Sequence, residues 1–186
     1  MNDALKNILE RNSHRSLVEP IPGGEEMELV YKAALRAPDH AWLRPTSFIE
    51  VQGEGLNRLS QAFGDYAKKH ISNLEADKLE KYKAAPFRAP MVIILINTPK
   101  QHAKVPETEQ IMSSAAAAQN ILLALNSLGY AGIWRTGTFA LNKNICKYLE
   151  LNSDQQVLGY LYVGMPEGNA KKIPNLDPKD YVTKWK

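Results

Sequence analysis

The strongest constraint on the fold is a long stretch without charge, residues 111–128, which reads IMSSAAAAQNILLALNSL. Its polar residues come in pairs, and these pairs fall on more than one side of a helical wheel. This pattern is typical of a helix that is covered on most sides, and not of a surface helix with one apolar stripe. Gly129 follows it as a suitable residue to end the helix. We therefore expect a buried helix at the centre of the protein.

The segment directly after this helix, residues 130–137, reads YAGIWRTG. It is flanked by glycines and carries an aromatic residue beside an arginine. A backbone with few bulky side chains next to a cation suits an anionic, aromatic ligand. This segment is the first candidate for a binding site.

Composition limits the class of protein. A chain of 186 residues that is 44% hydrophobic fits one domain, residues 1–186, with a real core. The net charge is +3 and the cationic residues are scattered, so charge gives no support for nucleic-acid binding. The single cysteine, Cys146, cannot form an intramolecular disulfide, the first residues lack the apolar core of a signal peptide, and no apolar run is long enough to span a membrane. We expect a soluble, cytoplasmic protein without membrane segments.

The rest of the sequence predicts fewer strands than helices, and strands and helices do not alternate regularly along the chain. This arrangement favours an α+β fold. A first, short helix is predicted where Leu5, Ile8 and Leu9 share a face, and a second from Glu25 to before Pro38. A third helix carries Leu56, Leu59 and Phe63 and is followed by a charged, solvated helical excursion at 66–85. A last short helix is predicted at 144–151. The predicted strands are 46–52, 90–97 and 157–164, of which the second is apolar throughout and should be buried on both faces. Residues 167–186 should form an extended tail that docks on another surface.

Some chemistries find no support. Neither a G-x-G-x-x-G nor a G-x-x-x-x-G-K-[ST] motif is present, and no G-x-S-x-G elbow occurs. The four histidines are not at the spacings of metal ligands, so we expect no metal site. Arg11, Ser13 and Arg15 lie within one turn and could hold a phosphate, although Arg11 could equally be an ordinary helix cap. His40, taken alone, fits a structural hydrogen bond better than catalysis.

Five short motifs occur along the chain in a fixed order. They are Arg11-Asn12-Ser13, Arg36-Ala37-Pro38-Asp39-His40, Pro86-Phe87-Arg88-Ala89-Pro90, Lys104-Val105-Pro106 and Gly132-Ile133-Trp134-Arg135-Thr136-Gly137. Each motif is weak alone, but five in register are specific and span nearly the whole chain. Together they resemble the nitroreductase family, and in particular its compact branch of short NAD(P)H nitroreductases.

This resemblance implies an FMN-dependent homodimer with a central mixed or antiparallel sheet, helices around it and two flavins at the subunit interface. The cofactor-binding residues that it implies are Arg11, Asn12, Ser13, Arg36, His40, Trp134, Arg135 and Thr136. His40 would reach the flavin of the other subunit, and Arg135 would bind the phosphate. No protein acid or base is implied, and a backbone amide of Gly132 or Ile133 would support flavin N5. The four alanines at 115–118 could let two subunits approach closely or could fill the core of one.

The chain departs from the family pattern at two positions. Asn12 stands where a second arginine is common in the family, and Thr108 stands where tryptophan is common. The sequence leaves open whether Arg15 compensates for the cation that is missing at Asn12. The expected function is hydride transfer from NAD(P)H through FMN to a flat, electron-poor acceptor such as a nitroaromatic or a quinone, by a ping-pong mechanism. The alternatives are a flavoenzyme that acts on a specific metabolite and a flavin-binding protein without reductase activity.

Overall fold

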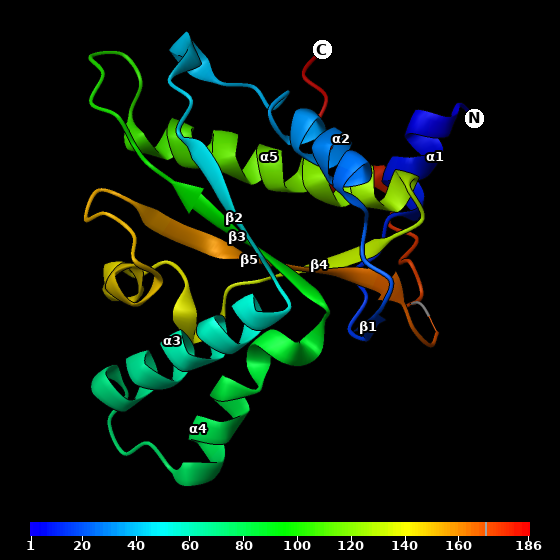
Figure 1. Ribbon diagram of the computed structural model, residues 1–186. Helices are drawn as coiled ribbons and strands as arrows, with labels where there is room; N and C mark the ends of the chain where they lie inside the picture. Colours follow the sequence, from blue (N-terminus) through cyan, green and yellow to red (C-terminus); the bar gives the residue numbers. More distant parts are fainter. Residues whose placement is uncertain (170) are drawn as a thin grey trace.

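The computed structural model describes residues 1–169 and 171–186, and it is built around one antiparallel sheet (Figure 1). The sheet has five strands: β1 Leu17–Val18, β2 Thr46–Gln52, β3 Met91–Asn97, β4 Ala131–Arg135 and β5 Gln156–Pro166. Their order is β1-β5-β3-β2, and β4 also pairs with β5. Every pairing is antiparallel, which makes β5 the strand with the most partners.

Helices lie on both faces of this sheet, as Figure 1 shows. The α-helices are α1 Asp3–Glu10, α2 Gly24–Ala34, α3 Glu54–His70, α4 Ala76–Lys83 and α5 Glu107–Ser127. The 3-10 turns are η1 His40–Trp42, η2 Ala85–Arg88, η3 Gly137–Phe139, η4 Lys143–Leu149 and η5 Pro178–Asp180. One core cluster joins the sheet to α2 and α5, and a second joins the other face to α3 and the turns η3 and η4. The predicted α+β fold is confirmed.

Strand β3 is the link between the two clusters. All seven of its residues are buried, as its apolar sequence predicts. Val92 and Ile94 belong to the cluster on the α3 side, whereas Ile93 and Leu95 belong to the cluster on the α5 side. Successive side chains of a strand point to opposite faces, so an uninterrupted apolar run is what a strand covered on both sides requires.

Helix α5 is covered on most sides, as its uncharged sequence predicts. Within residues 111–128 only Met112, Gln119 and Ser127 are exposed. The helix ends before Gly129, whose φ of 86° favours glycine. Its start lies earlier than the uncharged stretch, because Glu107 and Glu109 form an acidic first turn that the helix dipole stabilises.

Elements that the sequence did not predict are the two-residue β1 and the strand β4. The charged stretch 66–85 is also divided differently, because α3 continues to His70 and buries Tyr66 and Ala67 against the sheet. Tyr66 meets Phe139 edge to face at 5.6 Å. Within this stretch, α4 has no buried residues and matches the description of a solvated helix.

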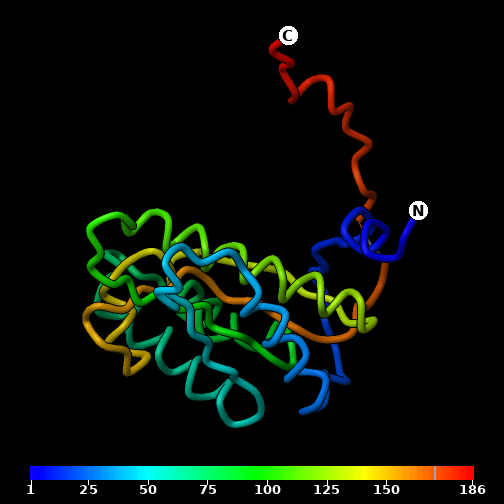
Figure 2. Tube along the Cα trace, turned by 90° about the horizontal axis from the view of Figure 1, so that it is seen from above, coloured from blue at the N-terminus to red at the C-terminus, as the bar shows by residue number. Residues whose placement is uncertain are grey.

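Both ends of the chain carry apolar side chains that the body does not cover. Leu5, Ile8 and Leu9 of α1 share a face, but each is more than half exposed. The C-terminal segment leaves the body and runs past the N-terminus, as Figure 2 shows. Its Tyr181 and Trp185 are 70% and 97% exposed. No helix of the described residues is long and apolar enough to cross a membrane.

Candidate functional site

The segment after α1 lies beside β4. Ser13 forms a parallel bridge with Gly132, so residues 11–13 run along the edge of this strand. The position is fixed by α1, because Asn7 donates to the Leu123 carbonyl at 2.9 Å and accepts from Asn126 at 2.6 Å. Two of the five sequence motifs are thereby brought together by the fold.

Arg11 and Asn12 have different surroundings within this segment. Arg11 caps α1 through its backbone N–H, which donates to Asn7 O at 3.1 Å. Its Nη1 is buried and has no hydrogen-bond partner among the described residues. The Asn12 side chain accepts from the Ser13 N–H at 2.8 Å and donates to the Lys171 carbonyl, which ties the tail to this segment. Arg11 is thus both a cap and a donor that lacks an acceptor.

Arg135, at the end of β4, is the second arginine with a buried donor. Its Nε is buried without a partner in the described structure, and its guanidinium lies 5.7 Å from the centre of the Tyr162 ring. Burial lowers the pKa of Arg135, and the positive charges of Arg88 and Arg15 lower it further, while Tyr162 opposes them. A half-buried cation surrounded by like charge is stabilised when an anion binds.

Arg88 is a member of this group that the sequence-based list of site residues does not contain. It ends η2, and it is close enough to influence the pKa of both Arg135 and Tyr162. Among the described residues, none of Arg11, Arg15, Arg88 and Arg135 forms a salt bridge. The signal for Arg88 was its place in one of the five motifs. We refer to Arg11, Arg15, Arg88 and Arg135 as the arginine group.

Two glycines allow close packing around β4, one beside Trp134 and one beside α5. Its Nε1 donates to the Leu158 carbonyl at 3.3 Å, and a Cβ on Gly159 would lie 2.0 Å from the same nitrogen. A Cβ on Gly132 would lie 2.8 Å from Leu122 of α5, so β4 can pass this close to the helix only with glycine there. Thr136, directly after the strand, is exposed.

The backbone of β4 is engaged by the sheet. Gly132 pairs with Val163 of β5 on one side and bridges Ser13 on the other, and Ile133 pairs with Tyr162. For an amide of Gly132 or Ile133 to support flavin N5, one of these pairings would have to open. That expectation stays a prediction.

His40 lies near the start of α5, whereas Arg36 lies just after α2. His40 Nδ1 is 2.7 Å from Glu109 Oε2 in the first turn of α5, and Arg36 is exposed just after α2. Helix α5 has 21 residues, which at 1.5 Å per residue is roughly 30 Å. Since α1 is attached near the end of α5 and His40 lies near its start, one chain does not bring His40 close to the segment after α1 (Figure 1).

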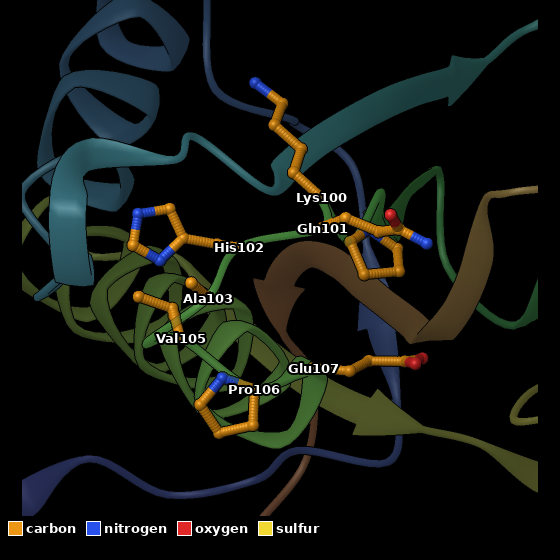
Figure 3. Close-up of a pocket in the computed structure, with 8 residues that line it drawn as sticks. Lys100, Gln101, His102, Ala103, Val105, Pro106 and Glu107 are labelled. Atoms are coloured by element: carbon orange, nitrogen blue, oxygen red, sulfur yellow. The ribbon is translucent and has the colours of Figure 1, made fainter.

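A cavity of about 600 Å³ lies in the loop between β3 and α5, near the same end of the helix. Figure 3 shows Lys100, His102 and Glu107 around it, with their side chains pointing in different directions. The side chain of Gln110 holds this loop by two hydrogen bonds to Lys100. Its Oε1 accepts from the Lys100 N–H at 2.9 Å, and its Nε2 donates to the Lys100 carbonyl at 2.8 Å. None of the predicted cofactor-binding residues lines this cavity.

A second cavity, of about 420 Å³, lies between β2, α3 and η4, and it too contains none of those residues. No group of three or more His, Cys, Asp or Glu side chains that could hold a metal ion occurs among the described residues. The arginine group, with its buried donors that lack acceptors, is therefore the strongest candidate for a ligand-binding site in the described structure.

Comparison with known proteins gives matches over most of the chain. Residues 8–165 match the model described as "Nitroreductase family". The chain is 34% identical over 182 residues to the "Putative NAD(P)H nitroreductase YdjA" of Escherichia coli strain K12, covering 97% of this chain and 98% of that protein. It is 31% identical over 183 residues to the "Putative NAD(P)H nitroreductase" of Haemophilus influenzae, again covering 97% of this chain and 98% of that protein.

Solved structures have the same fold. A nitroreductase-like family protein from Bacillus cereus superposes with a TM-score of 0.84 at 19% identity, covering 100% of this chain and 97% of that one. A nitroreductase with bound FMN from Bacteroides fragilis superposes with a TM-score of 0.75 at 21% identity, and both chains are covered completely.

Proposed function

Because this chain belongs to the nitroreductase family, we propose that it is an FMN-dependent oxidoreductase that takes electrons from NAD(P)H. The observation that carries the proposal is the arginine group, in which Arg11 Nη1 and Arg135 Nε are buried donors without acceptors in the described structure. FMN carries a phosphate dianion, which is the kind of acceptor that these donors lack. The relatives named NAD(P)H nitroreductase and the neighbour with bound FMN support the same assignment.

The residues present fit this cofactor. Arg11 and Arg135 would bind the phosphate, with the Ser13 hydroxyl and Asn12 beside them, and Arg15 and Arg88 would add positive charge. Trp134 and Thr136 flank Arg135 on the same segment and would contact the remainder of the flavin. Trp134 and Arg135 are on β4, Thr136 follows the strand, and Ser13 is bridged to it, whereas Arg88 ends η2.

A homodimer would supply the remaining contacts. His40 lies near the start of α5, far along the helix from the end at which α1 is attached, so we propose that His40 and Arg36 complete the site of the second subunit. The exposed apolar residues of α1 and of the C-terminal segment support this arrangement, because a partner could cover them. The exposed stripe of α5 that contains Met112 and Gln119 offers the partner a further surface.

When bound, FMN would supply the redox chemistry, accepting hydride at N5 from NAD(P)H and giving it to an acceptor. The chain would bind and orient the ring and hold its phosphate. We propose that the nicotinamide leaves before the acceptor binds in the same place, which gives a ping-pong mechanism. Flat, electron-poor compounds such as nitroaromatics and quinones fit an acceptor that stacks on the ring.

The decisive experiment is the visible spectrum of the purified protein before and after anaerobic addition of NADH or NADPH. We expect a yellow protein with the absorption of bound flavin, which bleaches on reduction and recovers when a quinone is added. A colourless protein that takes up no added FMN would contradict the proposal. A panel of acceptors then separates a general reductase from an enzyme for one metabolite, because a physiological substrate should stand out in kcat/KM.

Sedimentation and flavin content test the dimer. We expect a species of twice the chain mass of 20.8 kDa that binds one FMN per chain. If the protein is a monomer and still binds one FMN per chain, Arg36 and His40 of a second chain are not needed for flavin binding.

A further inference from the structure

We infer that Glu109 is a positioning residue, which fixes the ring of His40 so that it presents one nitrogen to the flavin of the partner subunit. The inference rests on the proposed function. It adds a residue that lies 69 positions from His40 in the sequence and outside the predicted set of cofactor-binding residues.

The contact itself determines which atom of the ring is used. His40 Nδ1 and Glu109 Oε2 are 2.7 Å apart, which is the short distance of a hydrogen bond to a charged group. A carboxylate can only accept, so Nδ1 must carry the proton. Nε2 has no hydrogen-bond partner within the part of the chain that the structure describes. It is therefore the atom that remains for a ligand.

Glu109 is a fixed point for this purpose. It lies in the first turn of α5, where a negative charge is favoured by the helix dipole, and its N–H donates to Pro106 O at 3.1 Å. The next residue, Gln110, is buried and holds the loop in front of the helix through both backbone groups of Lys100. The carboxylate thus extends from a rigid part of the molecule.

The loop that carries His40 is also held in an unusual conformation. Ala41, Trp42 and Arg44 have φ angles of 58°, 53° and 52°, a region that side chains other than glycine rarely occupy. Asp39 holds the loop together by accepting from the Arg44 N–H at 2.8 Å. Such conformations cost energy and persist where the surrounding structure enforces them, often at functional sites.

Stability alone does not account for the pair. The His40 and Glu109 side chains are 56% and 46% exposed, and contacts between side chains this exposed contribute little to stability. Orientation of the ring is a sufficient reason for the contact, because a ring held at Nδ1 loses little further freedom when Nε2 meets a ligand.

The test compares E109Q with E107Q in the flavin-loaded enzyme. Both substitutions remove one negative charge from the first turn of α5, but Glu107 forms no ion pair within the described residues. We expect E109Q to slow single-turnover reduction of the bound flavin by NAD(P)H about five-fold, which corresponds to about 1 kcal/mol, and to change the FMN Kd less than about two-fold. E107Q should match the wild type in both.

A double substitution shows whether Glu109 acts through His40. In an H40A background the further change E109Q should have no effect on the reduction rate, because the ring that it positions is gone. Equal loss in both backgrounds would overturn the inference. So would an E109Q enzyme that cannot be distinguished from E107Q.

Nitrogen-15 spectra of the histidine rings, measured without flavin, separate this inference from the proposed function. The Nδ1 signal of His40 should change in E109Q and stay unchanged in E107Q. If the wild type binds FMN and is reduced, while E109Q behaves as E107Q, the inference fails and the proposed function stands. If the wild type takes up no FMN, the proposed function fails and so does the role toward flavin, whereas the spectra still show whether Glu109 holds the ring.

Discussion

At one end of the candidate site, beside β4, Arg11 and Arg135 have buried nitrogen atoms without acceptors among the described residues, whereas at its other end, in the first turn of α5, His40 and Glu109 form a pair on the surface. The first end carries several cations and no carboxylate that pairs with them in the described structure. The second end has an imidazole beside a carboxylate and is open to solvent.

This difference indicates what each end lacks. The arginine group is incomplete until an anion binds, because a buried donor without an acceptor costs free energy. At the His40 end Glu109 holds Nδ1, while Nε2 has no partner among the described residues and the surface is not covered. Two copies of the chain, with a phosphate at one end and a neighbouring subunit at the other, would satisfy both.

The largest effect should follow from removing the guanidinium of Arg135. Arg135→Ala loses a charge-assisted hydrogen bond to the phosphate, which contributes about 1.5–3 kcal/mol and corresponds to a roughly 10- to 150-fold weaker FMN Kd. Titration of the apoprotein, followed by quenching of flavin fluorescence, measures this change. The control is Arg58→Ala, which removes an exposed arginine paired with Glu150 at 2.5 Å and should leave the Kd unchanged. An Arg135→Ala protein that binds FMN as tightly as the control would refute the role of Arg135.

The next effect concerns the packing that holds Trp134 and Arg135. In Gly159→Ala the new methyl group would lie 2.0 Å from Trp134 Nε1 and 3.1 Å from the Arg135 carbonyl, so the indole must move. Overpacking of this kind costs about 1–3 kcal/mol, which urea unfolding of the apoprotein would measure. Gly24→Ala, where no atom lies within 4 Å of the added group, is the matched control and should be neutral or stabilising. Equal unfolding midpoints for the two variants would mean that the site tolerates the displacement.

Arg88 gives a sharper test, because two of its effects should have opposite signs. Its charge repels that of Arg135, so Arg88→Gln should stabilise the apoprotein by about 0.5 kcal/mol while weakening FMN about three-fold. Both changes should shrink at high salt, which screens the charges. If Arg88→Gln instead lowered both the stability of the apoprotein and the affinity for FMN, Arg88 would contribute to packing and not to binding of the anion.

The contrast between the two ends also shows which parts of the fold the sequence could predict. Strand β3 and helix α5 follow from local patterns, namely an apolar run and a stretch without charge, and both lie where those patterns place them. Strand β4 was not predicted because five residues with a glycine among them give no clear strand pattern. Its extended conformation is stabilised by pairing with β5, which follows it in the sequence.

The site divides in the same way. Arg135 is marked by its motif, and the resemblance to a family supplies a role that no periodicity contains. Arg88 stands in one of the five motifs, but its effect on the pKa of Arg135 arises from tertiary packing, and Glu109 reaches His40 across 69 positions. Such partners depend on tertiary packing, so a single sequence does not identify them.

The smallest effect is expected where the chain departs from the family pattern. Asn12→Arg adds the cation that the resemblance to the family leads us to expect at this position, but Arg15 is already close enough to lower the pKa of Arg135. A further guanidinium would meet repulsion from the existing ones and would lose the bonds of Asn12 to Ser13 and Lys171. We therefore expect the FMN Kd to change by less than about three-fold, with Asn12→Gln as the uncharged control. Tightening of ten-fold or more in the same fluorescence titration would show that Arg15 does not replace the missing arginine and that the phosphate site of this chain is short of one cation.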